Sequence, residues 1–117
     1  MFRYALIPLM IFATPVLSDP PNIEGVVVRK DGANWRFDVT LSHADTGWDH
    51  YADGWRVVDG SGQELGMRTL AHPHVNEQPF TRSLSGVAIP AGTTEVGIQA
   101  RDNVTGWGQQ IRRVRLP

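Results

Sequence analysis

The strict alternation of apolar and polar residues in segment 35–41 constrains the fold of this chain more than any other feature of the sequence. Single polar residues separate its apolar ones, in the order Trp35, Arg36, Phe37, Asp38, Val39, Thr40 and Leu41. Successive side chains of a β-strand point to opposite faces, so this pattern places one face on a core and the other in water. The segment therefore predicts a half-buried β-strand.

Similar segments recur along the chain and are separated by turn-forming residues, whereas helical periodicity is nearly absent. The pattern predicts seven strands, at residues 23–30, 35–41, 54–59, 64–71, 80–89, 95–102 and 109–116. In the fifth strand the apolar parity changes across Ser85 and Gly86, which predicts a β-bulge there. Seven short strands without βαβ spacing favour an all-β sandwich of the immunoglobulin or fibronectin III type. The chain has no cysteine, so this sandwich has no disulfide.

The N-terminus has the pattern of a cleaved signal peptide. Arg3 precedes an uncharged apolar run that ends near Val16 and Ser18, and this run is shorter than a membrane-spanning helix of about 20 residues. We expect residues 1–18 to be removed and 19–117 to form a single periplasmic or secreted domain with no membrane span. Without a cysteine, no residue can carry a lipid anchor. An uncleaved membrane anchor is the alternative.

Charge argues against a nucleic-acid partner. The chain has 11 basic and 12 acidic residues, a net charge of −1 with neutral histidines, whereas nucleic-acid binding requires a concentrated cationic face. The one basic cluster, Arg112, Arg113 and Arg115, is typical of a charged strand that resists edge-to-edge pairing.

The connections between the predicted strands are of two kinds. Segments 31–34, 60–63 and 90–94 consist of ordinary turn formers, whereas 42–53, 72–79 and 103–108 are rich in histidine, carboxylate and aromatic residues. The two kinds alternate along the chain. If each strand runs opposite to its predecessor, the three dense loops meet at one end of the sandwich, where binding residues are commonly found.

The histidines predict a metal site in these loops. His72 and His74 are two residues apart on extended backbone, so both imidazoles project from one face. His43 and His50 are the expected further ligands, with Asp49 or Glu77 as alternatives, and such a donor set suits Zn²⁺ or Cu²⁺. In the competing interpretations the histidines only brace the loops or sense pH. Calcium is less expected than a helical turn over 46–53 capped by Asp45.

Three aromatic residues offer a different function for the same loops. Trp48, Tyr51 and Trp107, with Asp49 and Glu77 beside them, could bind a protein or glycan partner without a metal. The glycines on both sides of Trp107 favour its exposure. Enzymatic activity is not expected, because none of the common nucleophile or metalloprotease motifs is present, although a distant Ser-His-Asp set could still assemble a hydrolase.

Four stretches, HADTGWDHYADGW, LGMRTLAHPHVNEQPFTRSL, VAIPAG and ARDNVTGWG, resemble those of a family of small exported bacterial β-sandwich proteins of unknown function. The last stretch is also similar to the region before the final strand of fibronectin III-like domains. The resemblance implies export and a sandwich fold, and it implies no activity or cofactor.

Overall fold

The computed structural model describes residues 20–117, and within them every regular element is a β-strand. The expected signal peptide and its cleavage bond lie outside the described residues. The strands are β1 (Asn22–Asp31), β2 (Asn34–Ser42), β3 (Ala52–Val58), β4 (Glu64–Thr69), β5 (Phe80–Val87), β6 (Glu95–Asp102), β7 (Gly106–Trp107) and β8 (Arg112–Arg115). The described part contains no helix long and apolar enough to cross a membrane.

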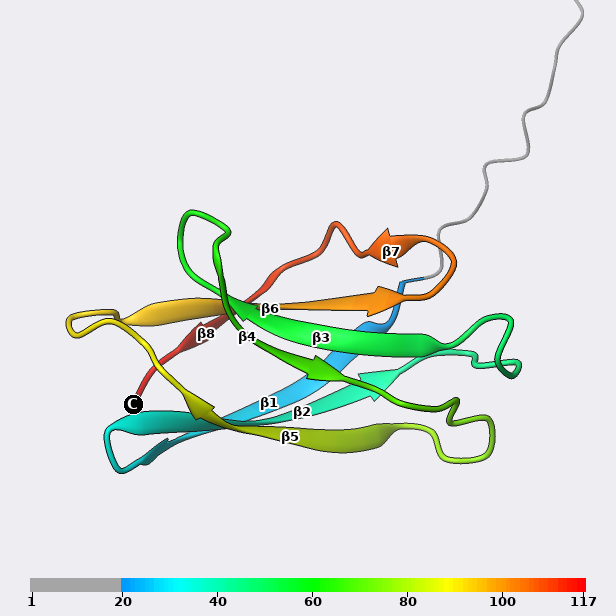
Figure 1. The fold of residues 1–117 in the computed structure, drawn as a ribbon, viewed down its shortest axis with the longest axis horizontal. Helices are drawn as coiled ribbons and strands as arrows, with labels where there is room; N and C mark the ends of the chain where they lie inside the picture. The colour runs from blue at the N-terminus through cyan, green and yellow to red at the C-terminus, as the bar shows by residue number, and fades with distance from the viewer. Residues whose placement is uncertain (1–19) are drawn as a thin grey trace, which may run out of the picture.

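These strands form two antiparallel sheets (Figure 1). One has the order β1-β2-β5, and the other has the order β4-β3-β6-β7, with β8 also paired to β6. The all-β prediction is confirmed, and each predicted strand has a counterpart in the structure. β7 is an additional strand of two residues inside the predicted loop 103–108, and β8 begins three residues later than expected.

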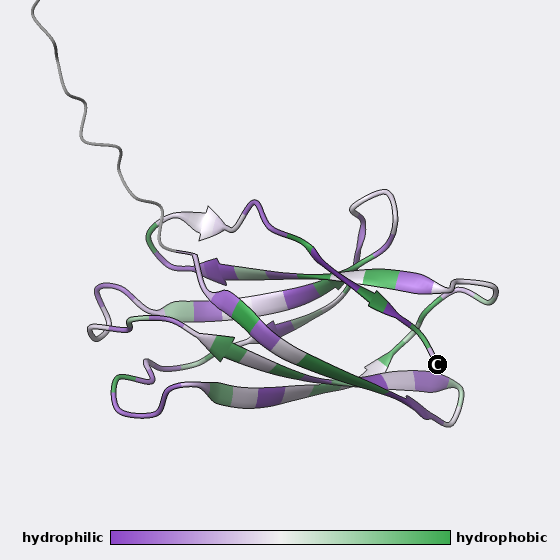
Figure 2. Ribbon diagram, turned by 180° about the vertical axis from the view of Figure 1, so that it is seen from behind, coloured by the Kyte–Doolittle hydropathy of each residue, from purple (hydrophilic) through white to green (hydrophobic). Residues whose placement is uncertain are grey.

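The core lies between the two sheets and follows the predicted alternation. Phe37, Val39 and Leu41 of β2 are fully buried, and they face Trp55 of β3 and Ile98 of β6, which are also fully buried. Figure 2 shows the same alternation of hydrophobic and hydrophilic residues along the strands. Each such aliphatic or aromatic side chain contributes about 1.5–3 kcal/mol on burial. This core is what holds the loop end in place.

The predicted bulge in the fifth strand is confirmed. Trp35 pairs with Val87 and Phe37 pairs with Leu84, so one side of the ladder has an extra residue between the two pairs. Gly86 lies in this interval with φ of 71°, a left-handed conformation that glycine adopts most easily. Leu84 and Val87 are three residues apart and would point to opposite faces of a regular strand. Because of the bulge, both pack toward the core.

The predicted convergence of the three dense loops is also confirmed. The loops after β2, β4 and β6 lie together at the right-hand end of Figure 1. Hydrogen bonds join them: the His43 amide donates to Gln78 Oε1 at 3.0 Å, and the Asn103 amide donates to the Tyr51 carbonyl at 3.1 Å. One end of the sandwich therefore collects the three loops that are rich in histidine, carboxylate and aromatic residues.

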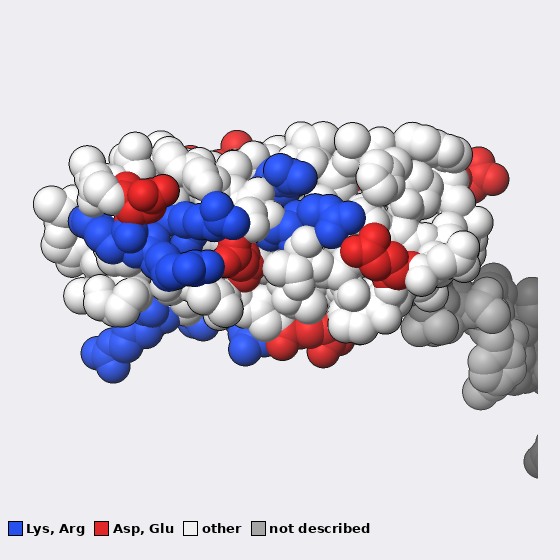
Figure 3. All heavy atoms as spheres, turned by 90° about the horizontal axis from the view of Figure 1, so that it is seen from below, with Lys and Arg blue, Asp and Glu red and all other residues white. Residues whose placement is uncertain are grey.

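The outer face of the β1-β2-β5 sheet carries basic side chains with acidic ones among them (Figure 3). Arg29 and Arg36 are cross-strand neighbours, and like charges in such positions repel. Asp38 offsets this repulsion by accepting hydrogen bonds from Arg29 at 3.1 Å and Arg36 at 3.2 Å, and from Ser83 at 2.5 Å. The Ser83 hydroxyl, followed by the two arginines, outweighs partial burial and lowers the pKa of Asp38 below its usual 3.8.

Replacing Asp38 with Asn is expected to lower the free energy of unfolding by about 1–2 kcal/mol at pH 7, because charge-assisted hydrogen bonds are lost and two arginines face each other uncompensated. A carboxylate whose pKa is depressed by folding stabilises the native state above its unfolded pKa, and this contribution is lost as pH falls through the folded pKa. Urea unfolding at several pH values should therefore show a difference that shrinks as the pH falls below the usual 3.8 of an aspartate and through its lower folded pKa. A difference that does not shrink as Asp38 becomes protonated would contradict this account.

Candidate metal centre

His43, His50 and Asp102 form a group at the loop end in which one potential ligand atom from each residue lies within 4.8 Å of the others. His43 follows β2, His50 precedes β3, and Asp102 is the last residue of β6. The group therefore joins neighbouring ends of strands from both sheets. The side chains of His43 and Asp102 are fully buried, and that of His50 is 27% exposed.

The orientation of His43 is determined by Asp45. His43 Nδ1 lies 2.5 Å from Asp45 Oδ1, which assigns the Nδ1 proton to this hydrogen bond and makes Nε2 the nitrogen suited to a metal. The His43 ring meets the ring of His50 edge to face, with centroids 4.7 Å apart. This packing brings the two imidazoles to the same point.

His50 contributes the most unusual atom of the group. Its Nε2 is buried and has no hydrogen-bond partner among the described residues, and it lies 3.8 Å from Asp102 Oδ1. Backbone contacts hold the residue in place, because its carbonyl accepts from the Thr46 amide at 3.0 Å and it forms a β-bridge with Gly47. The predicted helical turn over 46–53 is wrong, since this bridge closes a tight turn instead and Asp45 bonds elsewhere.

Asp102 is a buried carboxylate whose oxygens organise the turn after β6. Oδ1 accepts from the amides of Val104 at 2.8 Å and Thr105 at 2.6 Å, and Oδ2 accepts from the Thr105 hydroxyl at 2.6 Å. Burial alone would raise the pKa of Asp102, but these hydrogen bonds and nearby His50 lower it below its usual 3.8. The Asp102 carboxylate is therefore negatively charged at neutral pH.

His72 and His74 form a second cluster of their own, with ring centroids 4.6 Å apart. His74 stacks on Phe80 at 3.9 Å, and its Nε2 accepts from Arg82 at 2.9 Å. Burial, then the charge of Arg82, lowers the pKa of His74, so its imidazole is neutral at pH 7. The positively charged guanidinium of Arg82, which is hydrogen-bonded to His74 Nε2, would repel a metal ion at this nitrogen. The structure therefore separates this pair from the group of His43 and His50.

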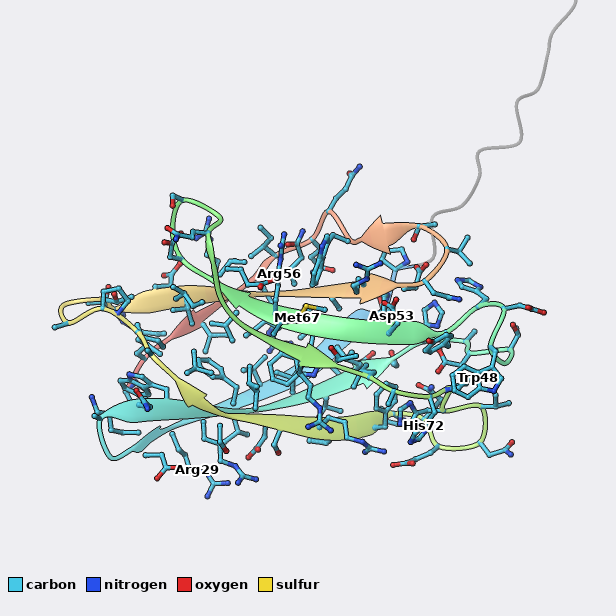
Figure 4. The ribbon with its side chains drawn as sticks, in the orientation of Figure 1. Arg29, Trp48, Asp53, Arg56, Met67 and His72 are labelled. Carbon is cyan, nitrogen blue, oxygen red and sulfur yellow. The ribbon has the colours of Figure 1, made fainter. Side chains whose placement is uncertain are left out.

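The aromatic residues of the loops are also divided between two places. Trp48 is 66% exposed and meets Tyr51 edge to face at 5.6 Å, close to the loop end where His72 also lies (Figure 4). Trp107 instead lies against Arg56, whose guanidinium is 4.0 Å from its ring, and Arg101, at 5.4 Å. Trp107 is half-buried, so its flanking glycines do not produce the expected exposure.

The two predicted carboxylates lie outside the histidine–aspartate group. Asp49 is exposed, and its carbonyl accepts from Asn103 Nδ2 at 3.2 Å. Glu77 is exposed as well and pairs with Arg82 at 3.4 Å. Asp102 is not among the residues predicted from the sequence for the site, where it was expected only as the end of a strand. Its signal is local: an Asp followed by Val-Thr at the second and third positions is typical of a side-chain-capped turn.

Two imidazoles and one carboxylate are ligands that transition metals accept. A tetrahedral ion with bonds of about 2.0–2.2 Å needs donors about 3.3 Å apart, whereas these atoms now lie within 4.8 Å of one another. His50 has the only partly exposed side chain of the three, so we expect its ring to make the required shift. Nitrogen and oxygen donors without thiolate suit Zn²⁺, Cu²⁺ or Fe²⁺ rather than Ca²⁺.

The fold and this group define an all-β domain with a histidine–carboxylate cluster at its loop end. A protein of Halomicrobium mukohataei named "Putative lipoprotein" is 41% identical over 90 residues, which are 76% of this chain and 44% of that protein. The chain thus spans less than half the length of this relative. No protein-family model matches the sequence, and no solved structure matches it.

Proposed function

We propose that this chain is an exported binding module of the cell envelope that holds one Zn²⁺ or Cu²⁺ ion through His43, His50 and Asp102. The observation that carries the proposal is the buried, unpartnered Nε2 of His50 among the described residues. A buried polar atom without a partner is costly unless something binds it. The adjacent His43 ring and the Asp102 carboxylate supply the donors that an ion at this point needs.

Export is supported from two sides. Segment 1–18 has the pattern of a signal peptide, and the relative from Halomicrobium mukohataei has a name that places it among lipoproteins. The strand order also favours an immunoglobulin or fibronectin III-like sandwich, because β1, β2 and β5 share one sheet while β3, β6 and β8 are neighbours in the other. Domains of this architecture commonly use loops at one end for binding.

Calorimetric titration with Zn²⁺ and Cu²⁺ tests this proposal. Wild-type protein is expected to bind one ion per chain, and His50→Gln is expected to lose at least 10-fold in affinity because one of three ligands is removed. His72→Gln is the matched control, since it removes a histidine from the second cluster of the same loop end. Equal affinity of His50→Gln and wild type, or loss only in His72→Gln, would contradict the proposal.

A second candidate function is recognition of a protein or glycan through apolar loop tips. Each of the three loops exposes one large apolar residue: Trp48 at 66%, Val75 at 51% and Val104 at 61%. Exposed apolar residues gathered at one end of a domain mark interaction sites more often than scattered ones do. This surface needs no metal, and Trp48 with its neighbour Tyr51 would be the anchor.

Affinity capture from envelope extract with wild-type protein and two variants tests the second candidate. Trp48→Ala is expected to lose the captured partner. Met67→Ala should retain it, because Met67 lies on β4, on the outer face of the sheet that β4 forms with β3 and β6, away from the loops (Figure 4). Equal capture by both variants would count against the loop tips as the binding surface.

A further inference from the structure

We infer that Asp45 is the positioning residue of the metal site and that it ties the β4–β5 loop to the bound ion. This inference rests on the proposed function and concerns a residue that does not touch the ion itself. Asp45 lies two residues after His43 in the loop between β2 and β3, and it is 7% exposed. No Lys or Arg among the described residues pairs with this buried carboxylate. Hydrogen bonds from the loops therefore stabilise it instead.

The first contact orients the ligand. Asp45 Oδ1 accepts the Nδ1 proton of His43 at 2.5 Å, which fixes the imidazole as the tautomer with a lone pair on Nε2. A carboxylate at this place also makes the opposite nitrogen a stronger donor to a metal. Without it, the ring could rotate or take the other tautomer, and the ion would lose a preorganised ligand.

The remaining contacts connect the loops. Asp45 Oδ1 also accepts from the Ala52 amide at 2.9 Å, and Oδ2 accepts from the His74 amide at 2.8 Å. One carboxylate therefore joins the start of the first dense loop, the beginning of β3 and the second dense loop. An ion on His43 polarises the ring and strengthens its bond to Asp45, so metal binding should also order the segment around His74.

The chemistry of the site distinguishes a carboxylate from an amide at this position. Asp45 accepts three hydrogen bonds with its two oxygens, and every partner is a donor. An asparagine has one oxygen and one NH₂ group, so one of the donors would meet another donor. Asp45→Asn is nearly isosteric with the native residue, which makes it the sharpest test of the inference.

The experiment compares Asp45→Asn with Asp49→Asn, which makes the same charge change at an exposed residue of the same loop. Zn²⁺ titration should show affinity 10–100-fold weaker for Asp45→Asn and unchanged for Asp49→Asn. In wild-type protein, Zn²⁺ should slow hydrogen exchange of the His74 amide, and this effect should be lost in Asp45→Asn. Equal Zn²⁺ affinity of the two variants would overturn the inference.

The tautomer of His43 and the binding of Zn²⁺ by wild-type protein together distinguish failure of this inference from failure of the proposed function. The ¹⁵N chemical shifts of the imidazole report the tautomer of His43 in metal-free wild-type protein, and the Nδ1-protonated form is expected. Finding the proton on Nε2 would overturn the inference even if Asp45→Asn does not fold. If wild-type protein binds no Zn²⁺ while the Nδ1 tautomer is present, the proposed function and the inferred role toward the ion both fail, and only the tautomer assignment stands.

Discussion

Replacing Asp102 with Ala is expected to abolish metal binding and to lower the free energy of unfolding by about 3 kcal/mol. The substitution removes a proposed ligand and also leaves the amides of Val104 and Thr105 without their acceptor. A hydrogen bond to a charged acceptor contributes about 1.5–3 kcal/mol, and these two are partly buried. Urea unfolding in the presence of a chelator measures the loss of stability without metal. Zn²⁺ titration measures the loss of metal binding.

Asp49→Ala is the control for Asp102→Ala, because it removes a carboxylate from an exposed residue of the same loop end. It should change the free energy of unfolding by less than about 0.5 kcal/mol. An Asp102→Ala protein as stable as wild type in chelator would show that the turn after β6 does not depend on this carboxylate. Full Zn²⁺ affinity in that variant would remove Asp102 from the metal site.

Replacing Trp55 with Ala is expected to destabilise the domain by about 3–5 kcal/mol. Trp55 is the largest fully buried side chain, and it lies on β3 in the middle of its sheet. Domains of this size have total stabilities of about 5–15 kcal/mol, so the variant should be close to unfolding at 37 °C. Thermal and urea denaturation followed by circular dichroism give the measurement.

Trp55→Phe tests the packing of the aromatic ring at this position. The indole Nε1 of Trp55 has no hydrogen-bond partner among the described residues, so removing its N–H sacrifices no hydrogen bond there. The smaller aromatic ring should therefore cost clearly less than Trp55→Ala. Equal losses for the two variants, or a loss below about 1 kcal/mol for Trp55→Ala, would contradict the central role of this side chain in the core.

The sheet structure could be predicted from the sequence because its physical determinants are local. Alternation in β2 reports directly which side chains are buried, and Phe37, Val39 and Leu41 are all fully buried as expected. The bulge at Ser85 and Gly86 was visible as a change of parity. Loop convergence followed from counting antiparallel strands, and it survived the addition of β7 because this strand lies within the last loop.

The arrangement of side chains within the loops could not be predicted in the same way. Spacing in the sequence favoured the pair His72 and His74, but it could not show that Arg82 donates to His74. Asp102 resembled an ordinary last residue of a strand, although the turn that follows it wraps around its carboxylate. The group itself joins residues far apart in the chain, because His43, His50 and Asp102 come together only when the loops fold back over the core.

A crystal structure of the protein with bound Zn²⁺, with the ion located by its anomalous scattering, tests the proposed site most directly. The account predicts one peak about 2.0–2.2 Å from an imidazole nitrogen of His43, Nε2 of His50 and a carboxylate oxygen of Asp102, with the His50 ring drawn toward the other two residues. A peak between His72 and His74, or no peak at the loop end at saturating Zn²⁺, would contradict it.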